Sequence, residues 1–480
     1  MKAIELKNVT FCYEGYDEKV LKDASMWVEY GEVALLSGFS GEGKSTVLSL
    51  VTGIIPHVTS GEITGEVLVD GEDITGRRMS EVSRKVGVVL QNAEAQIIQQ
   101  MVEDEIAFGC ENFAFPPEKI QEHIKRSCLQ MKLEPGWKTR TLSGGQKQRL
   151  MTAATLATGQ KILVLDEPLA NLDKAGAELL MNTLRELAGR GYAVLVVEHR
   201  LDMVLPFVDT VWNIREGHVR RIENKTEYLS AQAAYIRDEC MSSPTGQTAF
   251  QLSHAAFSVK SREILKDVTG SIQKGQRVLL LGENGCGKTT VLRMLARLYR
   301  PTKGTIVQGF DPELGQGVKG KKQWFKRVGV VYQNPNYQLF MPTVQQEVAY
   351  GAQSEEYARR IMELFGISQL AQRHPHSLSE GQKRRVSIAA VVASNPEVLL
   401  LDEPTVGQDY AGLKEMVHIL NLLHEESENT MITITHDMRC AEALCDHAIL
   451  IANGMIAEQG GKELAHRYFY GAGSEIEIAR

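Results

Sequence analysis

Short apolar runs separated by longer mixed stretches give the chain its pattern. Runs of four or five residues, rich in Val, Ile and Leu, predict buried strands at 33–36, 162–165, 193–197, 278–281, 398–401 and 431–435. The stretches between them have the length and polarity of helices, and this alternation predicts an α/β domain with a largely parallel sheet. No run approaches the roughly 20 apolar residues that span a bilayer. If the protein works at a membrane, we expect a partner to supply the spanning helices.

The second half of the chain repeats the first. Three motifs recur in the same order, which predicts two homologous domains: Gly38-Phe-Ser-Gly-Glu-Gly-Lys44-Ser45 with Gly282-Glu-Asn-Gly-Cys-Gly-Lys288-Thr289, Leu142-Ser-Gly-Gly-Gln146 with Leu378-Ser-Glu-Gly-Gln382, and Ile162-Leu-Val-Leu-Asp166-Glu167 with Val398-Leu-Leu-Leu-Asp402-Glu403. We place the domains at residues 1–225 and 250–480. The polar segment 226–249 between them is predicted to be a linker with room for one short helix.

Each copy has a glycine-rich loop between a predicted strand and a predicted helix. Backbone N–H groups of such a loop point at a phosphate, and the helix N-terminus adds partial positive charge. Lys44 and Lys288 are expected to reach the β and γ phosphates of ATP, while Ser45 and Thr289 ligate Mg²⁺. One such loop could be an ordinary turn, but two, each followed by the other motifs, predict nucleotide binding. The expected contacts are Gly38, Ser40, Gly41, Gly43, Lys44, Ser45 and Thr46 in the first loop, and Gly282, Asn284, Gly285, Gly287, Lys288, Thr289 and Thr290 in the second.

An apolar strand ends in Asp-Glu in both copies. In isolation this would be a buried strand that meets a solvated turn. Downstream of a phosphate loop, Asp166 and Asp402 are instead expected to hold Mg²⁺ through water, and Glu167 and Glu403 to act as general bases on the attacking water.

With these motifs the chain resembles the ATP-binding-cassette (ABC) superfamily over nearly its whole length. Leu-Ser-Gly-Gly-Gln is the signature of that family. The resemblance implies an ATPase whose two P-loop domains pack head to tail, so that each ATP lies between one phosphate loop and the other copy's signature. The signature residues carried over are Ser143, Gly144, Gly145, Gln146, Ser379, Gly381 and Gln382.

Two further residues of each copy match family positions. His199 and His436 follow strand-like runs, where a lone histidine would be structural, but the resemblance makes them the switch histidines that contact the γ-phosphate. Gln91 and Gln333 match the glutamine that senses Mg²⁺ and water. ATP and Mg²⁺ are therefore the expected cofactors.

The two copies depart from the family pattern in different ways. Glu380 replaces the first signature glycine, a mild change that active members of the family also carry. Tyr13 matches the aromatic residue that stacks on adenine, but Val259 stands at that position in the second copy. Because a stacking face contributes about 0.5 to 1.5 kcal/mol, we predict weaker nucleotide binding at the second loop.

The segments after the two glutamines resemble ATPases of energy-coupling-factor (ECF) importers of vitamins and transition-metal ions. They are Gln333-Asn-Pro-Asn-Tyr-Gln-Leu-Phe and Gln91-Asn-Ala-Glu-Ala-Gln-Ile, the latter with Ala93 in place of the usual proline. The resemblance implies a transmembrane scaffold protein and a small substrate-binding membrane protein as partners, at the cytoplasmic face of the membrane. Two alternatives stay open: the tandem ATPase of a sugar or nucleoside importer, and a soluble ribosome-associated or DNA-repair ATPase.

Composition narrows these possibilities only slightly. The net charge of −7 and a pI near 6.0 argue against a general nucleic-acid binder, so no nucleic-acid partner is expected. The seven cysteines are scattered without metal-ligand spacing, which predicts reduced thiols. The sequence does not identify the transported substrate, because its binding site would lie on another chain.

Overall fold

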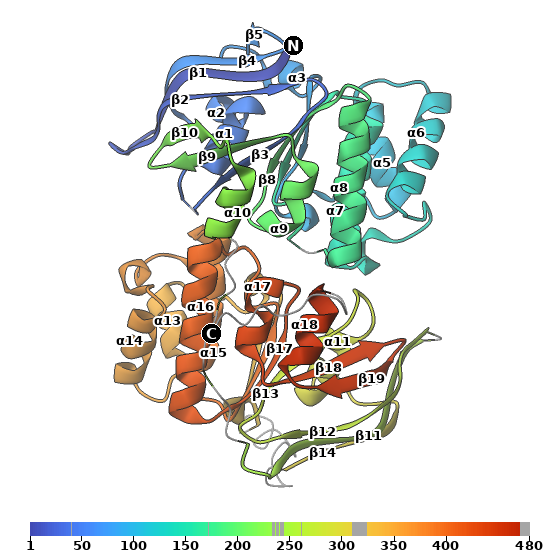
Figure 1. Cartoon of the computed structure of the whole chain (residues 1–480), viewed down its shortest axis with the longest axis vertical. Helices are drawn as coiled ribbons and strands as arrows, with labels where there is room; N and C mark the ends of the chain where they lie inside the picture. Colours follow the sequence, from blue (N-terminus) through green and yellow to red (C-terminus); the bar gives the residue numbers. More distant parts are fainter. Residues whose placement is uncertain are drawn as a thin grey trace. The chain divides into compact units, whose positions relative to one another are not determined.

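The computed structural model describes residues 1–39, 41–170, 172–232, 236, 240, 244–260, 262–309 and 324–470. The chain divides into two compact units, Met1–Ala234 and Tyr235–Arg480, and both have the same α/β architecture (Figure 1). Helix α10 (Lys225–Gln232) and the first residues of strand β11 (Thr248–Val259) occupy parts of the segment expected to be a linker. The domain limits inferred from the sequence remain a prediction.

The first unit contains the predicted mainly parallel sheet. Its strand order is β10-β9-β3-β8-β7-β6, with bounds His218–Arg221, Thr210–Arg215, Val33–Gly38, Ala193–Val197, Ile162–Asp166 and Val86–Val89. All neighbours pair in parallel except β10, which forms a hairpin with β9. The central strands are buried on both faces, which explains their continuous apolar runs.

A second, antiparallel sheet lies in the same unit and was not predicted from the sequence. Its order is β2-β1-β4-β5, with bounds Lys19–Glu29, Lys2–Tyr13, Gly61–Val69 and Glu72–Asp73. Buried and exposed positions alternate irregularly along β1 and β2, because several register shifts interrupt their pairing. These bulges weaken the two-residue period by which a half-buried strand is recognised.

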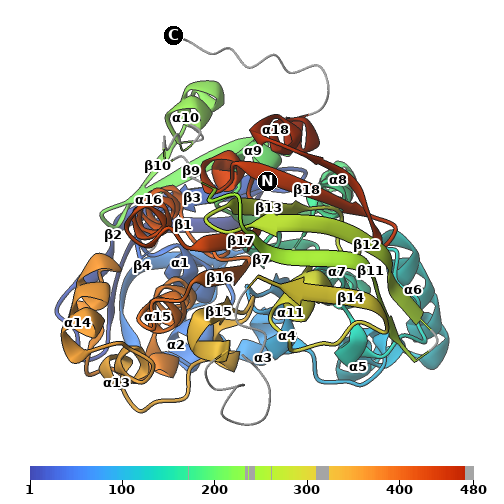
Figure 2. The ribbon, with the colours of Figure 1, turned by 90° about the horizontal axis from the view of Figure 1, so that it is seen from below.

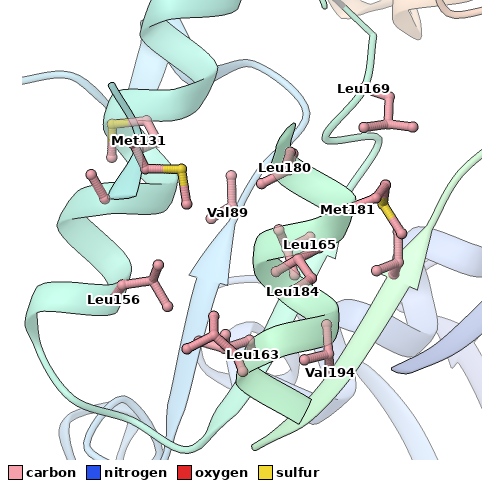
Figure 3. Packing of buried hydrophobic residues seen from close by; sticks show 14 of the residues in the cluster. Val89, Met131, Leu156, Leu163, Leu165, Leu169, Leu180, Met181, Leu184 and Val194 are labelled. Atoms are coloured by element: carbon pink, nitrogen blue, oxygen red, sulfur yellow. The ribbon is translucent and has the colours of Figure 1, made fainter. Parts of the chain in front are cut away.

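Helices cover the faces of the parallel sheet. Leu180 and Leu184 of α8 (Lys174–Gly189) lie beside Leu165 of β7 in the main apolar cluster (Figure 3). Helix α7 (Gly144–Ala157) packs against α5 (Val102–Asn112), α6 (Pro117–Gln130) and β6. The remaining helices are α1 (Lys44–Val51), α2 (Ile54–His57), α3 (Met79–Val82), α4 (Ala93–Gln96), η1 (Thr139–Thr141), α9 (Leu201–Val204) and η2 (Leu205–Phe207).

The second unit repeats this arrangement. Its described strands form one sheet of order β14-β11-β12-β19-β18-β13-β17-β16-β15, with further bounds Lys303–Gln308, Arg262–Gln273, Met455–Gly460, His447–Ala452, Arg277–Leu281, Thr430–Ile434, Val398–Asp402 and Val328–Val331. The helices are α11 (Lys288–Leu295), η3 (Pro335–Tyr337), α13 (Val344–Ala349), α14 (Glu355–Leu364), η4 (Ser368–Leu370), η5 (Pro375–Ser377), α15 (Glu380–Val392), α16 (Tyr410–Ser427), α17 (Met438–Ala441), η6 (Glu442–Leu444) and α18 (Lys462–Tyr470). Helix α18 lies along β18 and β19 (Figure 2).

Candidate functional site

Four neighbouring parallel strands place the predicted residues of the first unit at one edge of the sheet. Strand β3 leads into the phosphate loop, β8 ends just before His199, β7 ends at Asp166, and β6 ends shortly before Gln91. The carboxyl ends of parallel strands meet at the same edge, which is where α/β proteins bind ligands. Strands β13, β17, β16 and β15 do the same for the second unit.

The first glycine of each phosphate loop must be glycine. A Cβ on Gly38 would lie 2.4 Å from the carbonyl oxygen of Ile214, and one on Gly282 would lie 2.3 Å from that of Ile451. Both residues also have positive φ angles, 153° and 141°. The backbone therefore contacts the neighbouring strand directly where it leaves the sheet. This close contact sets the direction in which the loop runs to the N-terminus of the following helix.

Both phosphate-loop lysines are buried and folded back onto their own loops. The Nζ of Lys44 donates to the carbonyl oxygens of Gly38 (2.9 Å) and Phe39 (2.7 Å). The Nζ of Lys288 donates to those of Gly282 (2.6 Å) and Glu283 (3.0 Å). Each loop thus holds a cation at its centre, at the N-terminus of α1 or α11, where a helix dipole also favours an anion.

The other loop residues lie on the same helix starts. Gly41, Gly43, Gly285 and Gly287 have positive φ, Thr46 is buried, Ser45 is exposed, and Thr289 and Thr290 are half-buried. Ser40 lies outside the described residues. Asn284 contacts the Nε2 of His436 through its Oδ1, at 3.0 Å.

In the first unit the predicted catalytic side chains form one network around Glu167. The Nε2 of Gln91 donates to the Glu167 carboxylate at 2.7 Å, and the Nε2 of His199 lies 3.3 Å from its other oxygen. Burial favours the neutral form of Glu167, but the hydrogen bond and charge of His199 outweigh it and lower the pKa of this carboxyl. Glu167 is therefore held as a carboxylate, the form a general base requires.

The neighbouring carboxyl behaves in the opposite way. Burial, followed by the charge of Glu167, raises the pKa of Asp166 to about 7. Two adjacent acids with pKa values pushed apart suit two roles, and a cation bound beside Asp166 would favour its charged form. Burial also raises the pKa of Asp402 in the second unit, where the Thr289 hydroxyl donates to its Oδ1 at 3.3 Å.

Both predicted general bases have a strained backbone. Glu167 has φ 45° and Glu403 has φ 54°, in the left-handed region that side chains with a Cβ seldom adopt. The N–H of Glu167 donates to Val197 O at 2.8 Å, and that of Glu403 to Ile434 O at 2.9 Å. The end of the adjacent strand therefore holds each acid in this conformation, and such strain is typical of functional sites.

The second unit brings the same residue types together with different contacts. The backbone N–H of His436 donates to the Glu403 carboxylate at 3.2 Å, and its Nε2 lies 3.5 Å from the other carboxylate oxygen. Gln333 is exposed, and its carbonyl oxygen accepts from the guanidinium of Arg384.

The two signature motifs form the N-termini of helices α7 and α15 by the same capping box. The hydroxyl of Ser143 accepts from the N–H of Gln146, whose side chain accepts from the N–H of Ser143, and Ser379 and Gln382 repeat this exchange. Gly144 is half-exposed at the tip of α7, Gly145 is buried, and the carbonyl of Gly381 accepts from Gln408. Pairing of each signature with the other unit's phosphate loop remains a prediction.

Tyr13 and Val259 occupy equivalent strand ends. In the first unit Phe11 pairs with Leu21, and in the second Phe257 pairs with Leu265, which fixes the register two residues before each position. The hydroxyl of Tyr13 lies 2.9 Å from the hydroxyl of Thr46 in the phosphate loop. Val259 is about half exposed (49%) and has no aromatic face.

Sequence reasoning missed several residues that brace these sites. The buried guanidinium of Arg384 in α15 donates to the carbonyls of Tyr332 (2.9 Å) and Gln333, and burial lowers its pKa to about 10. At the matching position of α7, both amide atoms of the buried Gln148 lack a hydrogen-bond partner in the part of the chain the structure describes. The sequence did show that the two copies differ here, because Gln148 and Arg384 occupy the same position two residues after the last glutamine of each signature.

Two units with phosphate loops, acid pairs and helix-capping signatures define a tandem ATPase of the P-loop class. A family model described as "ABC transporter" matches residues 21–170 and 265–406. The chain belongs to the ABC family; it binds ATP with Mg²⁺ and hydrolyses ATP.

Three similarities extend over almost the whole chain. A Bacillus subtilis (strain 168) protein named "Putative HMP/thiamine import ATP-binding protein YkoD" is 30% identical over 96% of this chain and 91% of its own. A Treponema denticola protein named "Putative ABC transporter ATP-binding protein" is 30% identical over 95% and 96%. A chain from a solved structure, "Model of ribosome-bound archaeal Pelota and ABCE1", matches with a TM-score of 0.71 and 22% identity over 96% and 80%, which shows the fold alone.

Proposed function

We propose that this chain is the energising ATPase of a membrane importer of ECF type, which takes up a vitamin or a transition-metal ion. The residue runs after Gln91 and Gln333 and the import role in the name of the Bacillus subtilis relative support this proposal. No helix among the described residues could cross a membrane. The proposed partners are a transmembrane scaffold and a small membrane protein that binds the substrate.

The observation that carries the proposal is a set of exposed aromatic side chains after Gln333, together with one exposed apolar side chain after Gln91. In the second unit Tyr337, Phe340 and Tyr350 are exposed by 66%, 66% and 74%, and in the first unit Ile98 is exposed by 66%. Large side chains exposed together mark interaction sites more often than isolated ones do. We call Tyr337, Phe340 and Tyr350 the aromatic docking surface.

Buried carboxylates hold the backbone beneath these side chains. The Glu347 carboxylate, 3% exposed, accepts from the N–H groups of Phe340 (2.8 Å) and Met341 (2.7 Å). Glu105 of the first unit accepts in the same way from Ile98 (2.9 Å) and Gln99 (2.6 Å). A preorganised apolar surface loses little conformational entropy on binding, which suits a docking role.

A second link joins this surface to the catalytic edge of the sheet. The side chain of Gln338 accepts from the N–H of Tyr332 (2.8 Å) and donates to Val330 O (2.6 Å), at the end of β15. Gln96 accepts from Leu90 N at the corresponding place in the first unit (2.8 Å). Movement at Gln333 is therefore expected to move the aromatic docking surface, and movement at Gln91 is expected to move Ile98.

The test is recovery of partners with the tagged chain from its native membranes in mild detergent, identified by mass spectrometry. A multi-helix scaffold and a small membrane protein are expected. Tyr337→Ser with Phe340→Ser should lose both partners, whereas Val307→Ser, at an apolar residue on β14 that is also well exposed (59%), should keep them. Recovery of ribosomal or DNA-repair proteins without any membrane protein would contradict the importer proposal and leave the ATPase activity standing.

A further inference from the structure

A buried glutamate that is not among the predicted site residues lies between β8 and His199. Glu198 is 2% exposed, and it directly follows the apolar strand β8. A buried charge is costly unless it is paired or hydrogen-bonded. Its contacts therefore indicate what it does.

Glu198 accepts three backbone hydrogen bonds from two different segments. One carboxylate oxygen accepts from the N–H of Leu169 (3.0 Å), in the loop that follows Glu167. The other oxygen accepts from the N–H of His199 (2.8 Å) and of Arg200 (3.2 Å). The glutamate thus ties the loop after the general base to the segment that carries the histidine.

Arg200 ties the same loop from the opposite end. Its guanidinium donates to the carbonyl oxygens of Leu169 (3.2 Å) and Leu172 (2.9 Å). Hydrogen bonds to charged groups are stronger than those between neutral groups. Glu198 and Arg200 together form what we call the charged clamp, which binds backbone groups of Leu169 and Leu172 in the loop after Glu167.

The second unit has a neutral link at this place. Thr435 precedes its histidine, and the Thr435 hydroxyl lies 3.0 Å from the hydroxyl of Thr405 in the loop after Glu403. Position 437, which matches Arg200, is an aspartate. No acid precedes His436, and the N–H of this histidine donates to the carboxylate of Glu403 itself.

The two general bases differ in whether their carboxylate accepts the backbone N–H of the histidine. In the first unit Glu198 takes up the N–H of the histidine, so that the Glu167 carboxylate receives the side chains of Gln91 and His199. In the second unit the carboxylate of Glu403 accepts that backbone N–H as well, while the Nε2 of His436 lies 3.5 Å from its other oxygen. The first general base is therefore held by side chains that can respond to a bound nucleotide.

We propose that Glu198 is a positioning residue of the first unit, which fixes His199 and the loop after Glu167 as one body so that Glu167 keeps its catalytic orientation. It acts through these neighbours and does not touch the nucleotide. The inference rests on the ATPase activity of the chain and does not require the importer proposal.

The test uses the full-length chain with one general base disabled at a time. In a Glu403→Gln background, where Glu167 remains, Glu198→Gln replaces one acceptor oxygen by a donor NH₂ that faces backbone N–H groups. The kcat of ATP hydrolysis is expected to fall by about tenfold, since charged hydrogen bonds of this kind are lost, while KM for ATP changes less than about twofold. In a Glu167→Gln background the same substitution should leave the residual rate unchanged.

Two further variants keep the proposal testable. Arg200→Met removes the single guanidinium nitrogen, Nη1, that donates to both loop carbonyls, so it should lower kcat in the Glu403→Gln background even if Glu198→Gln does not fold. Thr435→Ala, the matched change in the second unit, should lower kcat in the Glu167→Gln background by no more than about threefold, because it removes a neutral bond. The proposal would be overturned if Glu198→Gln lowered kcat equally in both backgrounds. It would also be overturned if, in the Glu403→Gln background, Glu198→Gln raised KM as much as it lowered kcat, or left kcat unchanged.

Discussion

The two nucleotide sites are expected to differ in affinity because only one strand end offers an aromatic ring. Tyr13 is held in place by an edge contact with Phe11, with ring centroids 4.8 Å apart, and by its hydroxyl at 2.9 Å from that of Thr46. Val259 occupies the equivalent position without such a ring. The informative exchange is therefore Tyr13→Val in the first unit and Val259→Tyr in the second.

The size of the difference follows from the stacking face alone. A ring stacked on another aromatic system contributes about 0.5 to 1.5 kcal/mol beyond the area it buries. Since about 1.4 kcal/mol corresponds to tenfold in Kd, the second phosphate loop should bind ATP about 2- to 12-fold more weakly than the first. The two lysines should contribute similarly to ATP binding, because Lys44 and Lys288 are buried to nearly the same extent, with 6% and 7% of their surface exposed.

Isothermal titration with MgATP at a temperature that suppresses turnover would measure each site separately. Lys288→Ala leaves the first loop competent, and Lys44→Ala leaves the second. Tyr13→Val in the Lys288→Ala chain should raise Kd, and Val259→Tyr in the Lys44→Ala chain should lower it. Equal Kd values in the two lysine variants, before any exchange, would refute the reasoning.

Three other expectations concern single residues. Burial raises the pKa of Asp166 from its ordinary value of 3.8 to about 7, so between these pH values the folded chain holds a proton on Asp166 that the unfolded chain has lost. The stability of the folded chain should therefore fall as pH rises from about 4 to 7. Because a tenfold change in proton affinity corresponds to about 1.4 kcal/mol, the loss of stability amounts to a few kcal/mol. In EDTA, the thermal midpoint of Asp166→Asn should therefore depend less on pH than that of the wild type. The same pH dependence in the variant and the wild type would contradict this expectation. Arg384→Gln removes the guanidinium donors of two part-buried carbonyls, at about 1 kcal/mol each, and should lower the thermal midpoint by several degrees, unlike Arg360→Gln at an exposed ion pair; equal midpoints would contradict this. Gly282→Ala places a Cβ 2.3 Å from Ile451 O and should weaken ATP binding at the second loop at least about tenfold, whereas Gly351→Ala, with its nearest neighbour at 3.9 Å, should not; wild-type affinity in Gly282→Ala would show that the loop can shift.

Most of the parallel sheet could be predicted because its strands are buried on both faces. The run 193–197 coincides with β8, and 33–36 lies within β3. The antiparallel sheet could not be predicted in the same way. Its long strands carry bulges that break the alternation of apolar and polar residues, so Lys2–Tyr13 and Lys19–Glu29 have no regular period.

The candidate site divides in a similar way. Gln91, Glu167 and His199 follow strands of one sheet, and the structure brings them within hydrogen-bond distance. Which unit supplies each signature and where the domain boundary lies remain predictions. Glu198 and Arg384 were not predicted as site residues, because their roles depend on hydrogen bonds to backbone groups of distant segments, which the sequence does not show.

The left-handed backbone of Glu167 and Glu403 has a consequence for mutagenesis. At φ near 50°, glycine, asparagine and aspartate are tolerated, whereas a β-branched residue collides with its own backbone. Valine, isoleucine or threonine at position 167 or 403 would therefore damage folding as well as chemistry, and a survey of all substitutions would confuse the two losses. Substitution by asparagine removes the charge and relieves the backbone strain, whereas substitution by glutamine removes the charge alone. The difference between the thermal midpoints of the two variants would therefore measure how much stability the strained backbone of the native glutamate costs.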